Sequence, residues 1–107
     1  MVKTEKHGNN WTAYYDSDAK RYFACIMYTS REGREQYDYE ITQDMYVRLG
    51  SFSEDTENER LIKTAKMIYS FENTMYGTLG PERMVWDEEA HEAMLGHEQK
   101  KNMKGDA

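Results

Sequence analysis

The segment RYFACIMYT, residues 21–29, constrains the fold more than any other part of the chain. It has the length of a strand and is rich in the aromatic residues that strands favour. In a strand, alternate side chains point to opposite faces of the sheet, and here both alternating sets are apolar. Both faces of this strand are therefore candidates for burial. One set is Tyr22, Ala24, Ile26 and Tyr28, and the other is Phe23, Cys25 and Met27.

Two further segments extend this strand into a three-stranded antiparallel meander. WTAYY, residues 11–15, is rich in strand-forming residues, and QYDYEI, residues 36–41, alternates between apolar and acidic side chains. The connecting segments have the composition of turns. The alternation in residues 36–41 predicts a core-facing set and an outward-facing set. The first is Tyr37, Tyr39 and Ile41, and the second is Asp38 and Glu40.

Capping residues predict a short helix directly after the third strand. Thr42 is a suitable N-cap and Gly50 is a suitable C′ residue for a helix over residues 43–49. The alternative is that the strand continues through Val47. We favour the helix, because suitable capping residues are present at both of its ends.

A second helix is predicted over residues 57–76. Thr56 and Glu59 match the capping box T-x-x-E, and Gly77 is a suitable C′ residue. An apolar stripe supports a helical period in this segment. Its members are Leu61, Ala65, Ile68 and Met75.

A third helix is predicted over residues 87–100, with acidic residues at its start and lysines at its end. Pro81 suits the first turn of a helix, and residues 84–86 suit a short strand or an anchor that docks the last helix. Together the segments predict an α+β fold. It has a three- or four-stranded antiparallel sheet from the N-terminal half, with two or three helices packed on one face.

The length of 107 residues predicts one small domain, 1–107, in which residues 1–9 and 102–107 are frayed. The first residues lack the apolar segment of a secretory signal, and no run reaches the length of a membrane span. The single cysteine, Cys25, lies among apolar residues and is expected in the core. These features predict a reduced, cytoplasmic protein that does not bind membranes. No pattern in the sequence specifies an oligomeric state.

The charge is negative and unevenly distributed. The chain has 14 basic and 20 acidic residues, a net charge of −6, and residues 37–60 hold two basic and seven acidic residues, a balance of −5. Such a field repels nucleic acid and attracts basic proteins. We therefore expect a basic protein partner and no nucleic acid.

The sequence contains no complete pattern for a catalytic, cofactor or metal site. His91 and His97 are six positions apart, whereas zinc-binding helical pairs are four apart. A calcium loop that starts at Asp55 would need glycine and glutamate where Arg60 and Lys66 stand. We therefore expect no cofactor and no metal, and a protein that is not an enzyme.

The acidic segment is the best candidate for a partner-binding surface, because its carboxylates steer a cationic partner and its tyrosines add rigid contact area. The alternative is that these acids are a solvated face and the charged first turn of a helix. The candidate partner-binding residues are Asp38, Glu40, Asp44, Tyr46, Glu54, Asp55 and Glu57.

The small size, the negative net charge and the lack of a catalytic motif together favour a stoichiometric inhibitor. The leading hypothesis is an immunity protein that neutralises a cationic bacterial toxin, such as a nuclease, by covering its basic cleft. The alternatives are a phage- or plasmid-encoded mimic of DNA that blocks a host nuclease, and a small adaptor subunit of a larger assembly.

Overall fold

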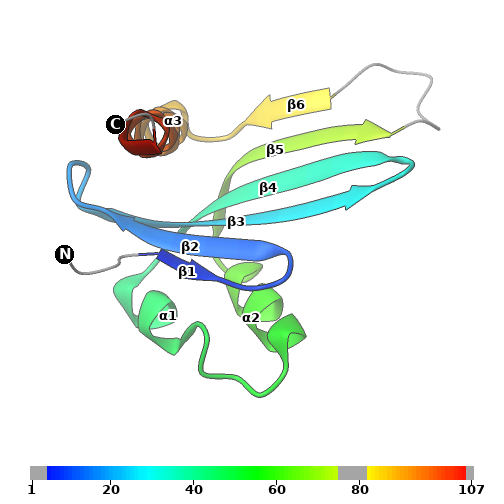
Figure 1. The fold of residues 1–107 in the computed structure, drawn as a ribbon, viewed down its shortest axis with the longest axis horizontal. Coiled ribbons are helices and arrows are strands. Elements are labelled where there is room, and N and C mark those ends of the chain that lie inside the picture. The colour runs from blue at the N-terminus through cyan, green and yellow to red at the C-terminus, as the bar shows by residue number, and fades with distance from the viewer. Residues whose placement is uncertain (1–4, 75–81, 106–107) are drawn as a thin grey trace.

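Each strand of the sheet pairs antiparallel with the next strand along the chain. The computed structural model describes residues 5–74 and 82–105, and within them six strands form one sheet in the order β1 to β6 (Figure 1). The strands are β1 (Glu5–His7), β2 (Trp11–Asp16), β3 (Arg21–Ser30), β4 (Gly33–Ile41), β5 (Lys66–Thr74) and β6 (Glu82–Val85). The helices in these residues are α1 (Gln43–Arg48), α2 (Asp55–Ile62) and α3 (Glu88–Gly105). The α+β class and the N-terminal meander are confirmed. The expectation of a three- or four-stranded sheet from the N-terminal half is wrong, because β1 pairs with β2, and β5 and β6 from the C-terminal half extend the sheet beyond β4.

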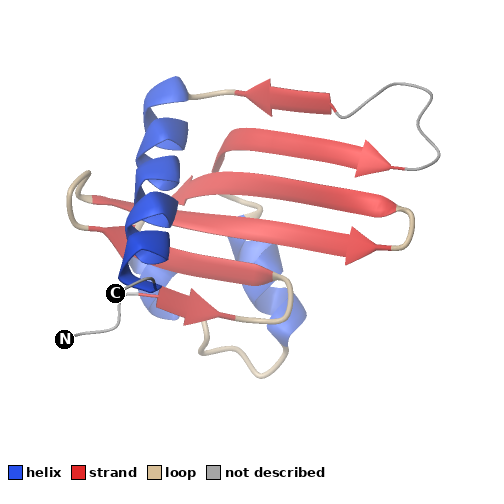
Figure 2. Ribbon diagram, turned by 45° about the horizontal axis from the view of Figure 1, so that its top comes forward, coloured by secondary structure: helices blue, strands red, loops and turns tan. Residues whose placement is uncertain are grey.

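Helices cover both faces of the sheet, so the expectation of a single covered face is wrong. Helices α1 and α2 lie on one face, here called the helix-pair face, and α3 lies on the other, here called the α3 face (Figures 1 and 2). The reason is visible in β3, whose two alternating sets are both apolar. Ile26 is fully buried in the core under α1 and α2, and Phe23 is fully buried in the core under α3.

The two cores differ in size. The larger core joins β2, β3 and β4 to the helix pair, and the smaller core joins β2, β3 and β5 to α3. The buried members of the larger core are Trp11, Ala13, Ala24, Ile26, Tyr39, Ile41, Leu49 and Ile62. The buried members of the smaller core are Tyr14, Phe23, Ile68, Ala90 and Met94, and Cys25 packs against them while partly exposed.

The short helix α1 forms where its capping residues predict it. The Thr42 side chain accepts a hydrogen bond from the Met45 amide at 3.2 Å, and Gly50 has a φ of 89°. Lys6 on β1 donates to the carbonyl oxygens of Tyr46 and Leu49, at 2.7 and 3.1 Å. These carbonyls lie at the end of the helix, where a cation is favoured. The alternative of a strand that continues through Val47 is therefore wrong.

The second predicted helix is much shorter than expected. Helix α2 ends at Ile62, and from Lys66 the chain forms strand β5 beside β4. The helical stripe in the sequence was misleading, since Ile68, Tyr69 and Phe71 are also residues that strands favour. The predicted capping box is wrong as well, because the helix begins at Asp55 and Glu54 is its N-cap. The predicted end at Gly77 lies outside the described residues.

The ends of the chain contribute more regular structure than expected. Residues 5–7 form β1 rather than a frayed terminus, and residues 102–105 belong to α3, which extends past the predicted end at residue 100. Met84 and Val85 belong to β6, as one of the two hypotheses for residues 84–86 proposed, while Trp86 is 58% exposed. The helix start expected at Pro81 lies outside the described residues.

A bulge in β5 connects the sheet to α3. Asp38 pairs with Tyr69 but Tyr39 pairs with Met67, so Ile68 is an extra residue on β5. Ile68 and Tyr69 both contribute to the smaller core, and Ile68 is fully buried. The Ile68 carbonyl accepts hydrogen bonds from the amides of Trp86 and Asp87, at 2.8 and 3.2 Å. The bulge thus directs the Ile68 side chain toward α3, and the Ile68 carbonyl fixes the segment that leads into α3.

Replacing Ile68 with alanine is expected to lower the free energy of unfolding by about 2–5 kcal/mol, because it leaves a cavity in the smaller core. Urea denaturation followed by circular dichroism measures this change. Leu95 on α3 is 48% exposed and is the control. Leu95→Ala should change the same free energy by no more than about 0.5 kcal/mol. Equal effects of the two substitutions would contradict the packing described for Ile68.

Candidate functional site

The structure divides the predicted partner-binding residues between the two sides of the molecule. Asp38 and Glu40 alternate with the core residue Tyr39 on β4, so they point to the α3 face. The other five lie on or next to the helix pair, on the opposite side. They are Asp44 and Tyr46 on α1, and Glu54, Asp55 and Glu57 at the start of α2.

Asp38 is 3% exposed, so the expectation that it faces solvent is wrong. Its carboxylate accepts hydrogen bonds from the Gln36 side-chain amide, at 3.2 Å to Oδ1 and 3.4 Å to Oδ2. Its neighbours across the sheet are Cys25 on β3 and Tyr69 on β5. Both of these neighbours pack against the smaller core, so Asp38 lies beside this core and not at the surface.

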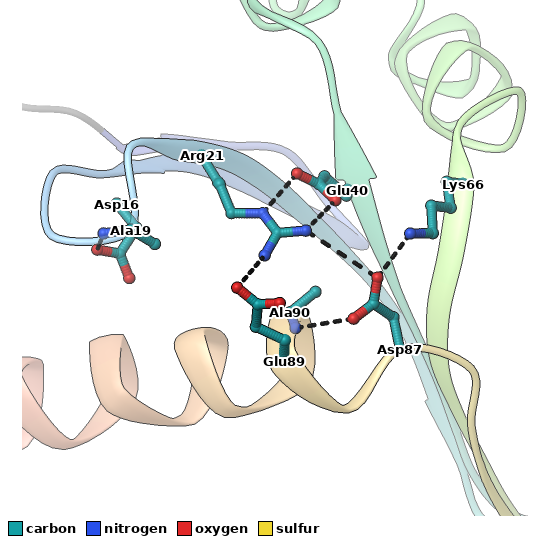
Figure 3. A network of polar contacts seen from close by, with 8 residues as sticks. All are labelled: Asp16, Ala19, Arg21, Glu40, Lys66, Asp87, Glu89 and Ala90. Carbon is teal, nitrogen blue, oxygen red and sulfur yellow. Dashed lines mark hydrogen bonds and ion pairs between the residues drawn. The ribbon is translucent and has the colours of Figure 1, made fainter.

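Glu40 belongs to a network of ion pairs that attaches α3 to the sheet (Figure 3). The Arg21 guanidinium forms two hydrogen bonds of 2.7 Å with the Glu40 carboxylate, and it lies 4.0 Å from Asp87 and 3.7 Å from Glu89. The hydrogen bond with Glu40 raises the pKa of Arg21. This two-point geometry is specific to arginine and carboxylate. Glu40 is therefore a structural residue.

Asp87 completes the network at the beginning of α3. Its Oδ2 accepts a hydrogen bond from Lys66 at 2.6 Å, and its Oδ1 accepts one from the Ala90 amide at 3.1 Å. The hydrogen bonds from Lys66 and from the Ala90 amide lower the pKa of Asp87. Asp87 thus caps the helix and links it to β5.

Asp55 holds the start of α2 against the β1–β2 turn. Its carboxylate accepts hydrogen bonds from the Trp11 indole at 2.6 Å, the Asn9 amide at 2.8 Å and the Asn58 side chain at 3.1 Å. The hydrogen bond from Trp11, followed by that from Asn9, lowers the pKa of Asp55. A Cβ atom at Gly8 would overlap the same indole. The Asp55 carboxylate therefore stabilises the contact between α2 and the β1–β2 turn.

The remaining predicted residues lie at or near the surface of the helix pair. Asp44 and Glu54 are exposed, and neither side-chain carboxylate forms a hydrogen bond or ion pair with any described residue. Glu57 is partly exposed and pairs with Arg60 at 3.0 Å. Tyr46 is half-buried, with its ring 5.2 Å from that of Tyr22 and 4.7 Å from the Lys6 ammonium. Tyr46 packs against the larger core and is not a freely projecting aromatic group.

An acid–tyrosine cluster on the helix-pair face was not among the predicted residues. We define it as Tyr28, Glu35, Tyr37 and Glu72. Glu35 and Glu72 stand directly opposite each other on β4 and β5, and Tyr28 is opposite Glu35 on β3. The Tyr37 hydroxyl lies 3.0 Å from a Glu35 oxygen and 2.7 Å from a Glu72 oxygen. Glu35 and Tyr37 are two positions apart, so alternation along a strand that includes residue 35 predicts that both side chains lie on one face. The predicted strand began at residue 36 and left Glu35 out.

The electrostatics of this cluster are unfavourable within the chain alone. Like charges directly opposite on adjacent strands repel each other. A phenol has one proton, so the Tyr37 hydroxyl can donate to only one of its two neighbouring carboxylates. Burial, followed by the hydrogen bonds to Glu72 and Glu35, raises the pKa of Tyr37, so the hydroxyl stays protonated. A cation beside Glu35 and Glu72 would relieve the repulsion.

Basic residues lie on the other face of the same strands. Arg34 and Arg83 alternate with the glutamates along β4 and β6, and the Arg34 guanidinium lies 5.0 Å from the Phe71 ring. Arg83 is opposite Phe71 in the backbone ladder. One end of the sheet extends beyond the helices (Figure 2). At this end, the register places Glu35 and Glu72 on the helix-pair face and Arg34 and Arg83 on the α3 face.

Among the residues that the structure describes, no group of three or more potential metal ligands converges. His91 stacks on Tyr69 with a ring separation of 4.2 Å and an angle of 9°. None of the described helices has the length and apolar character needed to cross a membrane. What the described surface offers is charge and aromatic contact area.

Comparison with protein-family models, with curated proteins and with solved structures finds no match to this chain. The functional argument therefore depends on the geometry above.

Asp55→Asn is expected to reduce the loss of stability in acid. The folded-state pKa of Asp55 is below its ordinary value of 3.8, so its charge stabilises the fold above that value. This contribution is lost as the pH falls from about 5 through the folded-state pKa. Urea unfolding at several pH values should show a lower stability of Asp55→Asn at pH 7 and a shallower decline below about pH 5. Glu54→Gln, an exposed neighbour, is the control. A decline as steep as that of the unmodified protein would contradict this role for Asp55.

Proposed function

We propose that this chain is a non-enzymatic acidic binding protein, namely an immunity protein or inhibitor that neutralises a basic protein toxin such as a nuclease. The acid–tyrosine cluster is the observation that carries the proposal. Its glutamates repel each other within the chain, and a lysine or arginine of a partner placed beside them would reduce this repulsion. A partner of this kind would use those basic residues to bind phosphate, so that covering them inhibits it.

The cluster has the composition of a recognition surface. Tyr28 and Tyr37 pack against the larger core at their base, which holds the rings in place before binding. The Tyr28 hydroxyl donates to Glu59, which orients the ring further. Rigid tyrosines give contact area at a low cost in entropy, and carboxylates beside them select a cationic partner. The cluster is therefore better suited to binding a basic protein than a flat neutral surface would be.

The exposed acids of the helix pair extend this surface. Asp44, Glu54 and Glu57 lie on the same side of the sheet as the cluster and contribute to a negative field that steers a cationic partner. Lys63 lies 5.6 Å from the Tyr28 ring, so the field is not uniform across this side. The strongest attraction is accordingly expected at Glu35 and Glu72.

The direct test uses the protein encoded by the reading frame adjacent to that of this chain. We expect this neighbour to be basic, to stop growth when it is expressed alone, and to be harmless when both are expressed. The purified pair should form a one-to-one complex, measured by light scattering, in which the activity of the neighbour is inhibited. A neighbour that is harmless alone, or that stays active and unbound, would contradict the proposal.

Glu35→Gln combined with Glu72→Gln is expected to weaken binding of that partner about tenfold at low salt, equivalent to about 1.4 kcal/mol. The free energy of unfolding should stay the same or rise by up to about 1 kcal/mol, because the repulsion is removed. Titration calorimetry and urea denaturation measure the two quantities. The matched control is Glu88→Gln combined with Glu92→Gln on α3, which removes the same charge from the opposite side. Equal losses of affinity in both double variants would show that net charge, and not the cluster, drives binding.

A further inference from the structure

The two edges of the sheet differ in a way that points to a binding site. Strand β1 forms one edge and consists of Glu5, Lys6 and His7, so polar and charged groups protect it. Strand β6 forms the other edge, and no described strand lies beyond it. Met84 is 50% exposed and Val85 is 42% exposed, and Trp86 directly after the strand is 58% exposed. Edges of this kind favour pairing with another chain.

The exposed apolar residues of β6 line both faces of this edge. Met84 is in register with Ser70 and Tyr37, which places it on the helix-pair face beside the acid–tyrosine cluster. Val85 is in register with Tyr69, which places it on the α3 face. An added strand would therefore find apolar contacts on both of its sides, as well as the outward backbone groups of β6.

The charge pattern specifies what kind of strand fits. The row of backbone positions that contains Glu35 and Glu72 continues to position 82, which is also a glutamate. The next position in this row would belong to the added strand. A basic residue there complements the row, whereas an acidic residue would add to its repulsion. A shift by one residue would turn the basic side chains toward the face that carries Arg34 and Arg83.

We propose that the β6 edge binds an extended basic segment of the partner as an additional strand of the sheet. This inference rests on the proposed function, because it specifies how the basic partner engages the acid–tyrosine cluster. Backbone hydrogen bonds supply affinity, and the alternating side chains supply specificity. Lysine or arginine residues lie on the helix-pair face, and apolar residues contact Val85 on the α3 face.

The experiment uses synthetic peptides and the ¹⁵N-labelled protein. The peptide KVKVKVK places all lysines on one face and all valines on the other, whichever way it runs. Its control, KVKPKVK, has the same charge, but the proline removes a donor and interrupts the strand. We expect KVKVKVK to shift the amide resonances of residues 83–86 and to bind about tenfold more tightly than KVKPKVK.

Matched variants of the protein complete the test. Met84→Ser combined with Val85→Ser should weaken binding of KVKVKVK at least about fivefold, since Val85 loses its contact with the valines and Met84 loses its contact with the aliphatic stems of the lysines. Val47 on α1 is 65% exposed and is the control, because Val47→Ser should leave the affinity unchanged. Thermal melts of both variants verify that they are folded.

The outcomes separate this inference from the proposed function. Equal affinities for both peptides, with a loss only in the Glu35→Gln and Glu72→Gln variant, would overturn strand addition and leave the proposed function standing. No binding of either peptide would overturn both proposals. A dimer of the unmodified protein that dissociates in the Met84→Ser and Val85→Ser variant would overturn the inference, because a second copy would then occupy the edge.

Discussion

The burial of β3 on both faces requires a layer of helix on each side of the sheet. Phe23 and Ile26 point to opposite faces and both are fully buried, which contributes about 1.5–3 kcal/mol for each side chain. The helix pair supplies Leu49 and Ile62 to one core, and α3 supplies Ala90 and Met94 to the other. The three-layer arrangement follows from this one strand, because a single layer of helices would leave one apolar set in water.

Much of the negative charge of the chain stabilises this arrangement. Glu40 binds Arg21 on the neighbouring strand β3, and Asp55 binds Trp11, which is 44 positions away in the sequence. Asp38 is 3% exposed. A buried or partly buried carboxylate must be satisfied by hydrogen bonds, so these acids are occupied before a partner arrives. The predicted acids left for recognition are therefore Asp44, Glu54 and Glu57, and all three lie on the side of the helix pair.

The proposed recognition surface exists because the strands extend beyond the part of the sheet that the helices cover. The end of the sheet near the β3–β4 turn extends beyond the helices on both faces (Figures 1 and 2). On that end, alternation along β4 sends Glu35 and Tyr37 to the helix-pair face and Arg34 to the other. The exposed β6 edge borders the same region. Charge, aromatic area and an open edge therefore meet in one part of the molecule, although they come from separate strands.

Local patterns in the sequence determined the meander over β2, β3 and β4, the short helix α1 and the start of α3. Thr42, Gly50 and the alternation in residues 21–29 act over a few residues, so they can be recognised without the fold. The end of α2 and the strand β5 were decided by pairing with β4, because the local sequence of β5 is compatible with a helical stripe as well as with a strand. The same holds for the site. Asp55 and Trp11 are 44 positions apart, and Glu35 and Glu72 meet only because β4 and β5 are neighbours. Local sequence determines which residues are acidic, whereas strand pairing decides which acids are neutralised within the chain and which face a partner.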